Sequence, residues 1–142
     1  MTEKILAVDD EPDMLKLLEM IIREKTTYGI LTTTNPLEAI ELVRKGGVDL
    51  LIADLKMPGL DGMELLNAVR GLDEDIPVII ITAYGTVESA VETMHLGAFD
   101  FITKPFKKEQ ILYTIDKALK FLRLERENRR LREQLNMEDT ES

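Results

Sequence analysis

Short apolar runs alternate along the chain with segments whose apolar residues recur at helical spacing. Five runs are mostly apolar: KILAVDD (4–10), YGILTTT (28–34), VDLLIAD (48–54), PVIIITA (77–83) and FDFITK (99–104). The first, third and fourth are apolar almost throughout, as is typical of strands that are covered on both faces. The second is rich in threonine, and we therefore predict that it lies at an edge of the sheet.

The segments between these runs begin with residues that favour helix starts. Pro12 suits a first helical turn, and Asp61 with Glu64 has the spacing of a capping box. Thr86 can cap the following helix, which Gly97 is expected to end. Five strand–helix units of this length predict an α/β fold: a doubly wound parallel sheet with helices on both faces.

The last segment changes its apolar pattern near residue 120. Up to Leu122 the apolar residues have the 3.6-residue period of a helix docked on the sheet. A second stripe with alternating three- and four-residue steps then follows: Phe121, Leu124, Asn128, Leu131 and Leu135. We therefore predict a compact domain over residues 1–120, and a helical coiled-coil linker with a disordered acidic end over 121–142.

Asn128 falls at an a position of these heptads, where a buried asparagine favours an in-register parallel dimer. Glu127 and Arg132 occupy positions that would attract each other across such a dimer. Two heptads are few, so a solvated charged helix that frays is the alternative.

Composition and charge exclude several classes of protein. The chain has 142 residues, 44% of them hydrophobic and 32% charged, and no cysteine, so disulfides and thiolate metal sites are excluded. Acidic residues come too early for a secretory signal, and no apolar run reaches membrane-spanning length, so a cytoplasmic location without membrane insertion is expected. Residues 1–105 hold 9 Lys/Arg and 19 Asp/Glu, a net charge of −10, which argues against direct nucleic-acid binding.

Polar side chains follow four of the five predicted strands. Asp9 and Asp10 follow the first strand, Asp54 the third and Lys104 the fifth, while Thr82 is near the end of the fourth. Singly, each could be a cap or turn residue. In an open parallel sheet, however, ligands bind outside the carboxyl ends of the strands, so these side chains are expected to form one site.

The chemistry of these residues is consistent with phosphoryl transfer. Three carboxylates in one pocket repel each other unless a cation neutralises them, and oxygen ligands without His or Cys select Mg²⁺ or Mn²⁺. A carboxylate beside such an ion can attack phosphorus. Lys104 and Thr82 can then contact phosphoryl oxygens, one through its charge and one through its hydroxyl. We therefore predict that Asp54 is phosphorylated.

Four motifs in this order resemble the receiver domains of two-component response regulators: VDDE (8–11), DLKMPGLDG (54–62), ITAYG (81–85) and FDFITKPF (99–106). The resemblance implies a flavodoxin-like five-stranded sheet in the order 2-1-3-4-5. It implies that Asp54 accepts phosphate from a histidine kinase. It also implies that Asp10, Asp54 and the carbonyl of Lys56 bind Mg²⁺, with Asp9 acting largely through water.

The same resemblance implies a conformational switch. Thr82 would move toward the phosphate and Phe101, at a position that is often tyrosine, would turn inward. The Lys104–Pro105 bond would be cis, and Tyr84 and Lys56 stand at positions that tune dephosphorylation. The chain would not be an enzyme for other substrates, because it would catalyse only its own phosphorylation and dephosphorylation.

The extended linker resembles that of activators in the nitrogen-regulation and dicarboxylate-transport class. There the receiver controls a sigma-54-dependent AAA+ ATPase and a DNA-binding domain, neither of which this sequence contains. The implied homodimer would use the C-terminal helix and the face of the fourth and fifth helices. A stand-alone receiver that acts by binding a protein partner is the alternative. An Mg²⁺-dependent enzyme for small phosphate esters ranks lower, because such families place the nucleophile near the N-terminus in an Asp-x-Asp pattern.

Overall fold

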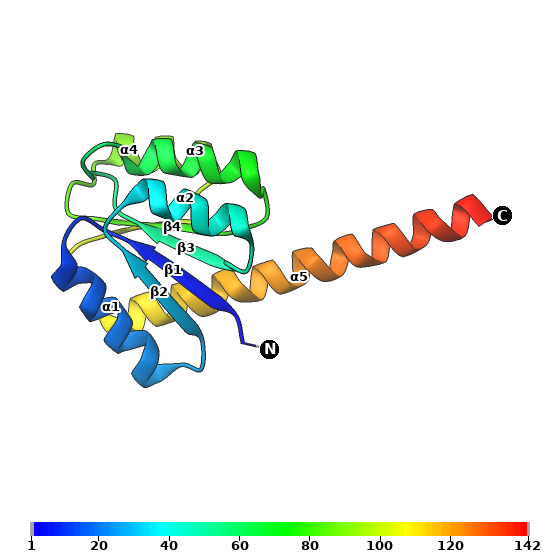
Figure 1. Cartoon of the computed structure of the whole chain (residues 1–142), viewed down its shortest axis with the longest axis horizontal. Coiled ribbons are helices and arrows are strands. Elements are labelled where there is room, and N and C mark those ends of the chain that lie inside the picture. The colour runs from blue at the N-terminus through cyan, green and yellow to red at the C-terminus, as the bar shows by residue number, and fades with distance from the viewer. Residues whose placement is uncertain (1, 142) are drawn as a thin grey trace.

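The computed structural model describes the backbone of residues 2–141 and the side chains of residues 2–136. A parallel five-stranded sheet in the order β2-β1-β3-β4-β5 lies between two layers of helices (Figure 1). The strands are β1 (Lys4–Val8), β2 (Gly29–Thr33), β3 (Leu50–Ala53), β4 (Val78–Thr82) and β5 (Asp100–Thr103). The helices are α1 (Pro12–Lys25), α2 (Pro36–Lys45), α3 (Gly62–Leu72), α4 (Val87–His95) and α5 (Lys108–Glu141). The predicted doubly wound fold and strand order are confirmed.

Burial explains this strand order. Every residue of β3 and β4 is buried, and so is all of β1 except Lys4, whereas β2 keeps mostly half-buried residues. The predicted edge position of the threonine-rich strand is therefore confirmed. Alternate residues of the central strands contribute to two hydrophobic cores, because side chains along a strand point to opposite faces. One core lies under α2 and α3, and the other under α1 and α5.

Local capping sets the helix starts at the carboxyl end of the sheet. Asp61 and Glu64 form the predicted capping box of α3, in which the Asp61 side chain accepts from the Glu64 amide at 2.8 Å. Thr86 caps α4 in the same way, through the amide of Ser89 at 3.0 Å. Gly97 follows α4 with a φ of +99°, which a glycine adopts without strain.

The helix α5 docks on the sheet and then continues past it. Its buried apolar residues pack against the α1 side of the core: Ile111, Ile115, Ala118, Leu119 and Leu122. Beyond Leu122 the helix projects from the domain, past the strand ends opposite the predicted site (Figure 1). The helix runs through residue 120 without a break, so the domain boundary predicted there stays a prediction.

The predicted disorder of the acidic end falls on residues whose side chains lie outside the described part, although the backbone is helical to Glu141. Within residues 2–141, no helix is long and apolar enough to span a membrane.

Candidate functional site

The carboxyl edge of the sheet brings three of the predicted site residues into direct contact. The Nζ atom of Lys104, just after β5, lies 2.9 Å from Asp9 Oδ2 and 2.9 Å from Asp54 Oδ2. Asp9 follows β1 and Asp54 follows β3, so one ammonium group joins the ends of three strands. Asp9 and Asp54 are only 3% and 2% exposed, which makes this a largely buried ion triad.

Burial and hydrogen bonding shift the pKa values of Asp9 and Lys104 in this triad. Burial raises the pKa of the Asp9 carboxyl, although hydrogen bonds from the Glu11 amide and from Lys104 oppose that rise. For Lys104, burial favours the neutral amine, but the hydrogen bonds and charges of Asp54 and Asp9 outweigh it and raise the pKa. Lys104 is therefore a permanent cation between two carboxylates.

The carboxylates can also accommodate a divalent cation. Asp9, Asp10 and Asp54 each offer an oxygen, and these oxygens lie within 4.8 Å of one another. Three carboxylates and one ammonium leave a net charge of −2, and Asp10 is exposed to solvent. An oxygen-only donor set of this charge fits Mg²⁺. The amide of Lys56 donates to Asp54 Oδ1 at 3.1 Å, while the role expected of the Lys56 carbonyl stays a prediction.

A cleft lies next to the triad, beside Asp10 and Lys56. Its lining residues come from the loops after β1, β3 and β4: Asp10, Glu11, Lys56, Met57, Pro58, Asp61 and Tyr84. Across it, Lys56 Nζ lies 5.0 Å from the centre of the Tyr84 ring. Tyr84 and Lys56 therefore flank this cleft, while the influence on dephosphorylation expected of their positions stays a prediction.

Thr82 ends β4 and is fully buried. Its hydroxyl oxygen accepts a hydrogen bond from the Tyr84 amide at 3.1 Å, and its carbonyl accepts from the Lys104 amide at 2.8 Å. Thr82 thus links the β4–α4 loop to β5. Its predicted contact with a phosphoryl group stays a prediction. The Lys104–Pro105 bond is cis, as the resemblance to receiver domains implies.

Two glycines shape the site in a way that the sequence motifs alone do not explain. A Cβ at Gly62 would lie 2.4 Å from the Asp54 carbonyl oxygen, so the first turn of α3 can approach the Asp54 backbone only with a glycine there. A Cβ at Gly85 would lie 2.9 Å from Phe101 Cε1 and 2.9 Å from Thr103 Cγ2. The half-buried ring of Phe101 packs on the core under α2 and α3, so Gly85 connects the β4–α4 loop to that ring.

Gly85→Ala should lower the free energy of unfolding by about 1–3 kcal/mol, because the new methyl group forces Phe101 or Thr103 to move. Urea denaturation of the two proteins measures the difference. Gly71→Ala is the matched control: nothing lies within 4 Å of a Cβ at that helical glycine, so it should be neutral or stabilising. Equal stability of Gly85→Ala and wild type would show that Phe101 does not pack on this loop.

Comparison with known proteins identifies this arrangement. The sequence matches the response regulator receiver domain family over residues 5–116. The chain belongs to this family. Receiver domains are phosphoryl-accepting regulatory domains rather than enzymes with an external substrate. The family predicted from the four motifs is confirmed.

Relatives of the chain include both short and long proteins. It is 40% identical over 119 residues to sporulation initiation phosphotransferase F of Bacillus subtilis, covering 84% of this chain and 95% of that protein. It is 35% identical over 135 residues to nitrogen assimilation regulatory protein NtrX of Azorhizobium caulinodans, covering 94% of this chain. Dicarboxylate-transport regulators match as well, which confirms the predicted kinship with that class.

Solved structures share the receiver fold. The beryllofluoride-activated NtrC4 receiver domain dimer superposes with a TM-score of 0.80 at 31% identity, covering 84% of this chain and 98% of that one. The chain spans only 26 to 30% of the length of several transcriptional regulators that it matches.

Proposed function

We propose that the chain is a phosphorylation switch in which Asp54 accepts a phosphoryl group from a histidine kinase. One observation carries this proposal: the nearly buried Asp54 carboxylate lies at a strand end beside a cleft, 2.9 Å from a lysine ammonium and within reach of two further carboxylates. No ordinary strand cap needs that set of charges.

In the proposed reaction, an Asp54 carboxylate oxygen forms the new bond to phosphorus. The bond from phosphorus to the kinase imidazole nitrogen breaks, its electron pair stays on that nitrogen, and a proton from solvent restores the neutral ring. When bound by Asp9, Asp10 and Asp54, Mg²⁺ supplies charge neutralisation between the acidic pocket and the incoming phosphoryl group. The Lys104 ammonium, which donates to the Asp54 carboxylate, then donates to the phosphoryl oxygens instead.

Thr82 and Phe101 then change conformation in response to the phosphorylation. The Thr82 hydroxyl, which accepts from the Tyr84 amide, turns to donate to a phosphoryl oxygen and draws the β4–α4 loop with it. Because Gly85 of this loop contacts Phe101, the ring moves further into the core. The surface over β5 and α4 changes as a result.

The proposed output is a change in homodimerisation that controls an attached effector. The face of α4 and α5 exposes Val87, Val91, Met94 and Tyr113, and the α5 extension exposes Leu124 and Leu131. The NtrC4 receiver is a dimer in its beryllofluoride-activated form, which supports homodimerisation as the output. The long regulators continue beyond the matched region, which supports a sigma-54-dependent AAA+ activator module as the effector. This reading places the protein in the cytoplasm.

A stand-alone receiver that acts by binding a partner is the second candidate. Sporulation initiation phosphotransferase F supports it, because that protein is matched over 95% of its length and so has little room for an effector domain. A chain that stays monomeric at high concentration, with or without phosphorylation, would favour this second function.

Sedimentation tests the switch directly. Beryllofluoride with Mg²⁺ should change the dimer dissociation constant of the full chain by about tenfold, a typical allosteric coupling. A chain that ends at Leu122 should associate more weakly and respond less. Asp54→Asn is the control, and it should not respond. Identical association in all four wild-type samples, long and short, with and without beryllofluoride, would mean that the tail is only a linker.

A further inference from the structure

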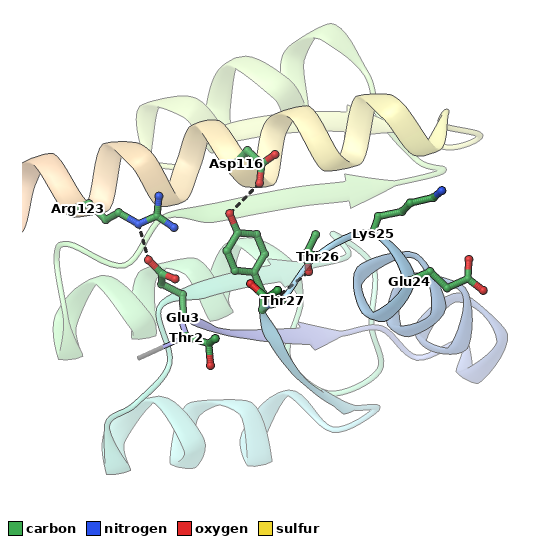
Figure 2. A pocket seen from close by; sticks show the side chains of 9 residues that line it. Thr2, Glu3, Glu24, Lys25, Thr26, Thr27, Asp116 and Arg123 are labelled. Carbon is green, nitrogen blue, oxygen red and sulfur yellow. Dashed lines mark hydrogen bonds and ion pairs between the residues drawn. The ribbon is translucent and has the colours of Figure 1, made fainter.

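Three arginines at every third position of the α5 extension contact the receiver body. Arg123 pairs with Glu3, and Figure 2 shows its Nε atom pointing at that carboxylate, beside a pocket that both residues line. Arg126 Nη2 lies 2.9 Å from Asp49 Oδ1, and Arg129 Nη1 lies 2.6 Å from Asp75 Oδ2. The sequence pattern of the linker did not predict these contacts.

The acidic partners stand in a row along the amino edge of the sheet. Glu3 directly precedes β1, Asp49 directly precedes β3, and Asp75 lies in the loop before β4. These strands are neighbours in the order β1-β3-β4, about 4.8 Å apart. Residues three apart on a helix advance by about 4.5 Å along its axis. The row of arginines therefore matches the row of strand starts, one arginine for each strand.

The carboxylates of this row are less exposed to solvent, and less free to move, than those of an ordinary surface ion pair. The side chains of Glu3, Asp49 and Asp75 are only 16–19% exposed, whereas their arginine partners are 50–52% exposed. Asp49 Oδ2 also accepts from the Lys4 amide at 2.8 Å, which holds it in place. The Arg123 guanidinium lowers the pKa of the Glu3 carboxyl, so this group is ionised at neutral pH. Preordered, partly buried carboxylates lose less entropy on pairing.

The opposite side of the helix carries the apolar stripe. At 100° per residue, Leu124, Leu131 and Leu135 lie about 120–180° around the helix from Arg126 and Arg129, and about 80–120° from Arg123. These leucines are 61%, 47% and 60% exposed. Contact with the receiver therefore leaves the stripe facing solvent.

We propose that the amino edge of the sheet is an electrostatic clamp that holds the α5 extension helical and directed away from the domain before any partner binds. The extension covers residues 123–141 and contains no alanine, and an isolated helix not much longer than about 12–15 residues has marginal stability in water even when it is rich in alanine. The clamp anchors its first two turns, residues 123–129, to rigid strand starts. A linker ordered in advance costs less entropy when a second copy pairs with its stripe. This last consequence rests on the proposed dimer, whereas the clamp does not.

Hydrogen exchange of the monomer tests the clamp. Amides 124–132 should be protected in the wild-type chain at concentrations where sedimentation gives a monomer, or in a Leu131→Glu background if the dimer persists. The triple variant Arg123→Gln, Arg126→Gln, Arg129→Gln should lower the protection of these amides by about tenfold. Amides of β1, β3 and β4 should keep their protection.

The matched control removes the same charge from the same helix: Lys120→Gln, Arg130→Gln, Arg132→Gln. Among the described side chains, none of these three pairs with the receiver body, and Arg130 pairs with Glu127 of its own helix at 2.6 Å. This control should retain the wild-type protection of amides 124–132. The exchanged pair Asp49→Lys with Arg126→Glu should retain most of it, because it restores an ion pair of opposite polarity.

Two results would overturn the proposal. In one, amides 124–132 exchange freely in the wild-type monomer, so the helix is not preformed. In the other, the triple glutamine variant is as protected as its control, so the clamp is not needed. Both are measured on monomers, so a chain that never dimerises would refute the proposed output and leave this test intact.

Discussion

Asp54→Asn should leave the chain unable to accept a phosphoryl group from acetyl phosphate, whereas the wild-type chain should gain one. Asparagine has nearly the same shape, and its side-chain oxygen can still accept from the Lys56 amide, which lies 3.1 Å from Asp54 Oδ1. The variant should therefore fold normally. It loses the anionic oxygen that attacks phosphorus in the proposed reaction.

Intact mass spectrometry after incubation with acetyl phosphate and Mg²⁺ measures this result. Asp13→Asn, an exposed acidic residue in the first turn of α1, is the matched control and should be phosphorylated like wild type. Removal of the divalent cation should suppress the wild-type adduct, because the acidic pocket then repels the phosphoryl donor. An equal adduct on Asp54→Asn would show that another residue accepts the phosphate.

Lys104→Met should lower the free energy of unfolding by about 3 kcal/mol in the absence of divalent cations, because breaking a buried ion pair leaves its partners uncompensated. Asp9 and Asp54 would then stand side by side in a pocket where both are nearly inaccessible to solvent. A domain of this size can bear that loss, since typical stabilities are about 5–15 kcal/mol. The variant should therefore remain folded at low denaturant.

Mg²⁺ should restore much of this stability, and it should bind Lys104→Met more tightly than it binds wild type. The ammonium of Lys104 occupies the same carboxylates that offer oxygens to the cation, so its removal relieves direct competition. Urea denaturation with and without Mg²⁺ measures both effects, and Lys16→Met on the exposed face of α1 is the control. If Mg²⁺ stabilises Lys104→Met no more than wild type, the acidic cluster is not the cation site.

The sequence predicted the site because the site residues directly follow strands of a regular sheet. Asp9 and Asp54 each follow a strongly apolar run and Lys104 follows a mixed one, and a parallel sheet brings the carboxyl ends of such strands to one edge. The capping box of Asp61 and Glu64 is equally local, because both its hydrogen bonds form within one helical turn. The strand at the edge was predictable for the same reason: its threonines make it less apolar than its neighbours.

Contacts between distant segments were not predictable in this way. The glycine at residue 85 looks like any loop glycine until the fold places Phe101 within 3 Å of its missing Cβ. Thr82 was expected to face the phosphate, and only the structure shows that its hydroxyl accepts from the Tyr84 amide.

The sequence by itself determined the strands, the helix caps, the carboxylate pocket and the family, because each depends on residue type and short-range spacing. Only the tertiary structure decided the direction of the linker. Arg123, Arg126 and Arg129 have partners about 50 to 120 residues away, and those partners form a row only after β1, β3 and β4 lie side by side. A heptad pattern identifies the side of a helix that can pair with another helix. The contacts of the opposite side depend on which strand starts lie next to it in the folded sheet.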